Sequence, residues 1–177
     1  MKSSLSLLAG SLMFASAYAG NPPAAPNLHD LMKNVVAVQA QVIWDVGNNA
    51  QDAEGNPDAS KVKAADWSRL VSATGKVKQI AQTLGQADHV MAAAPGQKLT
   101  GEGDPGTFSA KQVQNAIDAN PKAFRAFAQA LSVSMDEIAA AAQAKDAAKL
   151  FDVSGRLDQV CEVCHVQFWY PEQKAPR

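Results

Sequence analysis

The segment that decides the fold class is residues 120–144, NPKAFRAFAQALSVSMDEIAAAAQA. Its apolar side chains recur every three or four residues, at Phe124, Phe127, Ala128, Leu131, Met135, Ile138 and Ala142. That spacing places them on one face of an α-helix. Asn120 and Pro121 predict the helix start, because asparagine caps free N–H groups and proline suits the first helical position. The pattern therefore predicts a long amphipathic helix that ends at a break near residues 144–146.

A second helical pattern begins near Asn27, after a proline-containing lead-in over residues 21–26, and ends at residues 47–49. Its expected apolar face consists of Leu28, Met32, Val35, Gln39, Val42 and Val46, widened by Leu31 and Val38. The period of three or four residues again indicates an amphipathic helix.

Two more segments carry the same period. The first has a face at Trp67, Leu70, Thr74, Val77, Ala81, Leu84, Asp88 and Met91. We expect this helix to close near Pro95 and Gly96, before a glycine-rich crossing loop over residues 95–108 and a short turn from Ser109. The second has a face at Leu150, Val153, Leu157, Val160, Cys161, Cys164 and Phe168, and Pro171 is expected to end it.

Four helical patterns without a credible strand predict an all-α fold, specifically an antiparallel up-down-up-down four-helix bundle. The chain has 177 residues, of which 47% are hydrophobic, and this is enough apolar material for one domain over residues 20–177. Its 16 basic and 17 acidic residues are dispersed along the chain, so we expect no nucleic-acid-binding patch.

The first nineteen residues have the pattern of a secretory signal peptide. Lys2 supplies the positive start, a short apolar stretch follows, and residues 17–19 form an Ala-Tyr-Ala cleavage pattern. We expect cleavage after Ala19 and export of the chain. The apolar stretch is shorter than the roughly 20 residues that span a bilayer, so stable membrane insertion is not expected.

Residues 161–165 read CEVCH, which is the CxxCH pattern of covalent haem attachment. Cys161 and Cys164 are three residues apart, and on a helix this spacing lets both thiols reach the two vinyl groups at one porphyrin edge. His165 is turned further around the helix, where a neutral imidazole is able to bind iron. The motif predicts one covalent haem c, with its iron bound by His165.

Three other interpretations compete for these residues. A thioredoxin-like redox pair expects a strand-helix context, and no sheet is predicted here. A structural zinc site needs four ligands, but the chain has no further cysteine and only His29 and His89 besides His165. A simple disulfide between Cys161 and Cys164 is the third alternative.

With these features together, the chain resembles the cytochrome c prime family, and especially its low-spin branch. The likeness extends from Leu28 to Tyr170, and the CxxCH near the C-terminus is its strongest motif. The resemblance implies an antiparallel bundle in the periplasm with the haem at one end. It also implies that a methionine on the first helix serves as second axial ligand, and the matching residue is Met32. Many family members have Arg or Lys four residues after the haem histidine, whereas this chain has Trp169 there. A role in nitric oxide handling at that face is therefore in doubt.

The geometry of an up-down bundle supports Met32 independently, because the end of the last helix lies beside the start of the first. Met32 is about 7 to 8 Å into its helix, and His165 is a similar distance from the end of its own. His29 lies one turn earlier, nearer the solvent-exposed end, and is the lesser candidate. Met32 packing against the haem without binding iron stays open. Met91, Phe124 and Phe127 are expected to wall the pocket.

These residues favour an electron carrier, because Met/His ligation suits a haem that changes oxidation state with little rearrangement. The alternative function is a five-coordinate haem protein that binds small gases such as NO and CO. An enzyme is not expected, because the expected pocket supplies no polar acid-base group. The partners would be periplasmic redox proteins, and a homodimer stays open.

Overall fold

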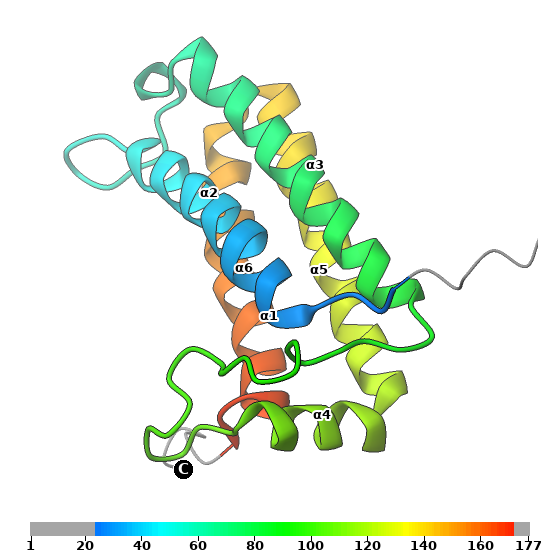
Figure 1. Ribbon diagram of the computed structural model, residues 1–177. Helices are drawn as coiled ribbons and strands as arrows, with labels where there is room; N and C mark the ends of the chain where they lie inside the picture. Colours follow the sequence, from blue (N-terminus) through cyan, green and yellow to red (C-terminus); the bar gives the residue numbers. More distant parts are fainter. Residues whose placement is uncertain (1–23, 172–177) are drawn as a thin grey trace, which may run out of the picture.

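The computed structural model describes residues 24–171, and within that range the chain is helical and contains no β-strand (Figure 1). The elements are α1 Leu28–Leu31, a π-helical turn Met32–Val36, α2 Ala37–Asn49, a 3₁₀ turn Ala59–Lys61, α3 Ala64–Gln86, α4 Ala110–Ala119, α5 Pro121–Ala144 and α6 Ala147–Phe168. The predicted all-α fold class is confirmed for these residues. The signal peptide expected over residues 1–19 lies outside the described residues.

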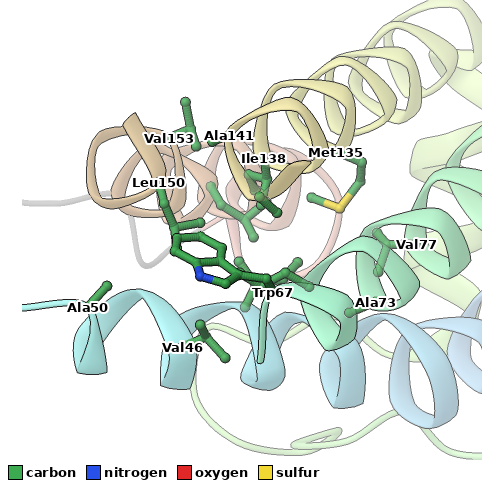
Figure 2. Close-up of a cluster of buried hydrophobic side chains, with 14 of the residues drawn as sticks. Val46, Ala50, Trp67, Ala73, Val77, Met135, Ile138, Ala141, Leu150 and Val153 are labelled. Atoms are coloured by element: carbon green, nitrogen blue, oxygen red, sulfur yellow. The ribbon is translucent and has the colours of Figure 1, made fainter. Parts of the chain in front are cut away.

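The long helices form a bundle in which α3 packs against α5, α5 against α6, and α2 against both α3 and α6 (Figure 1). Between them lies a core that we call the central cluster, and Figure 2 shows part of it around the buried indole of Trp67. Its largest fully buried side chains include Ile43, Leu70, Met135 and Leu150. Each of these comes from a different long helix, so one core joins all four.

The helix predicted from residues 120–144 is α5, and its predicted apolar face is buried apart from the half-buried Phe127. Pro121 occupies the first turn, as expected. The Asn120 side chain makes no capping hydrogen bond, so that part of the prediction was wrong. The break before α6 is confirmed: Lys145 adopts the left-handed conformation, and the Asp146 carboxylate accepts the Lys149 N–H at 2.9 Å.

The first helix has its predicted ends, but its buried face differs from the prediction. The five-residue turn Met32–Val36 is π-helical, and the Ala37 N–H donates to the Met32 carbonyl. A π turn adds one residue to the helical repeat. From the end of this turn the buried positions are Val36, Ala40 and Ile43, one residue beyond the predicted Val35, Gln39 and Val42. Near the end of the helix the predicted Val46 is buried, so that part of the prediction is confirmed. Val38, expected to widen the apolar face, is 51% exposed.

The second predicted helix ends earlier than expected. α3 stops at Gln86, Asp88 is exposed, and Met91 lies in the following loop rather than on a helix. The reason is pairing with α1: the Leu28 N–H donates to the Met91 carbonyl at 2.8 Å, and the His29 N–H donates to the Ala92 carbonyl at 3.0 Å. These bonds satisfy N–H groups that the start of a helix otherwise leaves free.

Instead of the short turn expected from Ser109, the chain forms the ten-residue helix α4, which lies across one end of the long helices (Figure 1). Ser109 and Gln112 make a reciprocal capping box at its start. Val113 and Ile117, one turn apart, are its buried residues. This spacing and the capping box were both visible in the sequence, so a helix could have been predicted here and the sequence analysis missed it.

Within residues 24–171, no helix combines the length and the apolar character needed to cross a membrane.

Candidate functional site

A second group of buried side chains fills the end of the bundle beside α4, and we call it the end cluster. Its buried members are Leu84, Val90, Ala92, Val113, Ile117, Phe124, Ala128 and Phe168. Several segments meet here, because α1, the end of α3, the loop between α3 and α4, α4 itself, the start of α5 and the end of α6 all contribute buried or half-buried side chains. Every residue predicted to hold the haem lies in α6 or in the first helix near this end.

The two cysteines of the motif lie three residues apart on α6, and neither is in a disulfide. Both are half-buried: Cys161 packs against the central cluster and Cys164 against the end cluster. Burial, with a smaller effect of Asp158, raises the pKa of Cys161 to about 11. Burial and the neighbouring Cys161 raise the pKa of Cys164 to about 12. The pair therefore consists of protonated thiols facing apolar surroundings.

His165 follows in the last turn of α6 and is half-buried. Burial lowers the pKa of His165, and the carboxylate of Glu162 opposes this effect. The His165 ring lies edge-on to the ring of Trp169, with ring centroids 5.0 Å apart. The centroid of the Tyr170 ring is 5.7 Å from that of His165. The lowered pKa favours the neutral imidazole, which is the form that binds metals.

The chain turns back immediately after α6. The N–H groups of Trp169 and Tyr170 both donate to the His165 carbonyl, at 2.7 and 3.0 Å. The Trp169 carbonyl in turn accepts the Phe108 N–H at 2.7 Å, which attaches the loop before α4 to this turn. The Tyr170 hydroxyl donates to the Glu162 carboxylate at 2.6 Å. Burial, followed by this hydrogen bond, raises the pKa of Tyr170.

Met32 is the first residue of the π-helical turn and is half-buried. It packs against both the central cluster and the end cluster, which is also where Cys161 and Cys164 pack. π turns are often found at functional sites. His29 is also half-buried, one turn earlier in α1.

The residues predicted to wall the pocket lie in two places, Phe124 and Phe127 on α5 and Met91 in the loop after α3. Phe124 is buried and Phe127 half-buried, and both rings meet Phe168 edge-on, at centroid distances of 5.7 and 6.1 Å. Met91 is half-buried in the loop after α3. His89, which the zinc interpretation considered as a ligand, is exposed.

The residues at this end fit a covalently attached haem. Two free thiols and a neutral imidazole are the donor set that haem c requires. The indole Nε1–H of Trp169 is buried and has no acceptor among residues 24–171, although it belongs to the ring beside His165. A buried donor without a partner is rare in a folded chain. Such a donor is expected where a bound group outside the polypeptide lies next to the indole.

The other interpretations of the motif fit less well. Cys161 and Cys164 lie inside α6 rather than at a strand-helix junction, and their pKa values are raised, whereas reactive thiols have lowered ones. A structural zinc site needs four ligands. Residues 24–171 contain no group of three or more His, Cys, Asp or Glu side chains placed to hold a metal ion.

Comparison with protein-family models, with curated proteins and with solved structures finds no match to this chain. The resemblance to the cytochrome c prime family therefore depends on the CxxCH motif and the helix pattern alone.

Sequence reasoning missed two residues of this site, Glu162 and Tyr170, which contact each other and, through Tyr170, reach His165. Glu162 is three residues before His165 on a predicted helix, so their proximity was predictable. The position of Tyr170 was not, because it depends on how the chain turns after α6.

Proposed function

We propose that this protein is a periplasmic c-type cytochrome that transfers electrons through one covalent haem, held by Cys161, Cys164 and His165. The observation that carries the proposal is the pair of free, half-buried thiols on α6 with an imidazole beside them, at the junction of the central and end clusters. When bound, haem supplies a one-electron Fe(III)/Fe(II) couple.

Each residue of the chain has a defined part in this proposal. Cys161 and Cys164 hold the porphyrin edge through thioether bonds, which keep the cofactor in place in both oxidation states. His165 supplies an iron ligand. Phe124 and Phe168 are buried on the same side of the bundle and keep water away from the site. A dry, rigid site favours electron transfer because little rearranges when the iron changes charge.

The sixth iron ligand in this proposal is Met32. Its support is the half-buried position against both clusters and the π turn that begins at this residue. π turns inside α-helices occur frequently at functional sites.

We also propose the finer arrangement, an antiparallel up-down-up-down bundle of the cytochrome c prime family with the haem at one end. A connection of only two residues, Lys145 and Asp146, between the packed helices α5 and α6 supports it. Export after cleavage at Ala19 and redox proteins of the periplasm as partners complete the proposal. Sequencing the N-terminus of the exported protein tests the cleavage, with Gly20 expected first.

Covalent attachment is tested by expressing the chain with a c-type maturation system and extracting it with acid-acetone. The haem should stay with the protein, and replacing both Cys161 and Cys164 by alanine should abolish its retention. Val163→Ala is the matched control, because Val163 lies between the cysteines, is 49% exposed and packs on neither cluster. Haem that is extracted from the parent protein would refute covalent attachment.

The spectrum of the same protein then separates electron transfer from the alternative of gas binding. With Met32 as ligand, the haem should be low-spin in both oxidation states. Met32→Ala should give a high-spin ferrous form that binds carbon monoxide faster, because no thioether has to leave first. A parent protein that is already high-spin and binds carbon monoxide as fast as the variant would favour the five-coordinate, gas-binding function.

A further inference from the structure

The hydrogen bonds around Tyr170 have only one consistent direction. Its hydroxyl oxygen is 2.6 Å from Glu162 Oε2 and 3.4 Å from His165 Nδ1. A hydroxyl has a single proton to donate, and a carboxylate only accepts. The Tyr170 proton therefore goes to Glu162, and the Tyr170 oxygen is left to accept a proton from Nδ1 of His165.

This direction favours one tautomer of His165 over the other. A neutral imidazole carries one proton, on either Nδ1 or Nε2. In the tautomer that has its proton on Nδ1, this proton faces the Tyr170 oxygen, and the lone pair of His165 is on Nε2. Nε2 is then the nitrogen available to bind iron, and the ring is already in the ligating form.

The backbone keeps Tyr170 in place for this contact. The two N–H groups after α6 both donate to the His165 carbonyl, so the chain folds back over the last helical turn. The ring of Tyr170 then packs against Trp169, with centroids 5.3 Å apart. Glu162 reaches the same hydroxyl from the preceding turn of α6. The contact is thus held by three features: the helix, the turn after it and the neighbouring, tilted ring of Trp169.

We propose that Glu162 and Tyr170 form a hydrogen-bonded chain that selects the Nε2-ligating tautomer of His165 and lowers the reduction potential of the haem. The inference depends on the proposed function, in which His165 binds iron. Hydrogen-bond acceptors behind a ligating histidine make the ring a stronger electron donor. A stronger donor stabilises Fe(III) relative to Fe(II), and the negative charge of Glu162 strengthens the effect through the Tyr170 hydroxyl. Both are positioning residues, because they act through His165.

The first test is the reduction potential of the holoprotein with Tyr170→Phe, which removes the hydroxyl and keeps the ring. The potential should rise, with the equilibrium between reduced and oxidised protein shifting about tenfold, or about 59 mV for a one-electron couple. The second readout is hydrogen exchange of the His165 Nδ1–H, followed by NMR in the ferrous protein. It should become faster in Tyr170→Phe, because the proton has lost its acceptor.

The charge of Glu162 needs a control of its own, because removing any nearby negative charge raises the potential. Asp158→Asn is that control: Asp158 lies one turn earlier on α6 and is exposed, as Glu162 is. Glu162→Gln should raise the potential more than Asp158→Asn does. In a Tyr170→Phe background, the effect of Glu162→Gln should fall to that of the control, because the connection to His165 is broken.

The outcomes separate this inference from the proposed function. If covalent haem is retained but Tyr170→Phe changes neither the potential nor the Nδ1–H exchange, the hydrogen-bonded chain is refuted and the cytochrome stands. An effect of Glu162→Gln that persists undiminished in the Tyr170→Phe background would refute transmission through Tyr170. A parent protein without covalent haem would refute both proposals together.

Discussion

Replacing Gly47 with alanine should destabilise the fold, because α2 and α6 leave no space for a methyl group at this position. A Cβ on Gly47 would lie 2.7 Å from Ser154 Oγ and 3.3 Å from Ser154 Cβ. Ser154 is 5% exposed, and its hydroxyl donates to the Phe151 carbonyl at 3.2 Å, so the side chain has little freedom to move away. The two helices would have to separate or Ser154 would have to change rotamer.

Two opposing effects set the magnitude. Overpacking a buried contact costs about 1–3 kcal/mol. Alanine in place of glycine inside a helix returns about 1 kcal/mol. The net change should therefore be a loss of roughly 0–2 kcal/mol in the free energy of unfolding. Gly75 and Gly155 are the controls, because a Cβ at either helical position meets nothing within 4 Å. Alanine at the controls should stabilise the fold by about 0.5–1 kcal/mol.

The assay is urea unfolding followed by far-ultraviolet circular dichroism, with the three variants measured side by side. In a protein that already carries Ser154→Gly, Gly47→Ala should no longer lower the free energy of unfolding. Ser154→Gly removes both atoms that the new methyl group would meet. If Gly47→Ala stabilises the protein as much as Gly75→Ala, the close contact between α2 and α6 is not a constraint and the reasoning fails.

Three further substitutions test other parts of the fold by the same unfolding assay. Leu150→Ala should cost about 2–5 kcal/mol, because Leu150 is fully buried in the central cluster; a loss below 1 kcal/mol would contradict its burial. Lys145→Gly should stabilise the fold by about 0.5–1 kcal/mol, because Lys145 has a φ of 54° that glycine adopts without strain, and destabilisation would argue against this conformation. Gln97→Ala should cost about 1–2 kcal/mol, because Gln97 donates to Asp30 at 2.7 Å and accepts the Ala94 N–H at 2.9 Å; unchanged stability would mean that these bonds are replaced by water.

The sequence was sufficient where burial follows a regular period. α5 and α6 have the predicted faces, because their apolar residues keep the helical spacing from Phe124 to Ala142 and from Leu150 to Phe168. The break between them was visible for the same reason. The CxxCH motif and its position on the last helix are local features, so the core of the candidate site was also predictable.

Tertiary contacts decided the features that the sequence did not reveal. α3 ends at Gln86 because the residues after it pair with the backbone of α1, and no local pattern reports that pairing. The π turn at Met32 shifts the buried positions from Val36 to Ile43 by one residue, which periodicity alone does not distinguish from a regular helix. Likewise, Tyr170 meets His165 because of a turn after α6, to which the distant Phe108 N–H is hydrogen-bonded.

The attachment of the loop after α3 to α1 has a kinetic consequence. The first turn of α1 is held by partners far away along the chain, such as Gln97, which is 67 residues from Asp30. Closing so long a segment costs entropy before any bond forms, so contacts of this kind form late in folding. We expect the turn that leads into Met32 to be unstructured in the folding transition state, while α5 and α6, joined by two residues, are already paired.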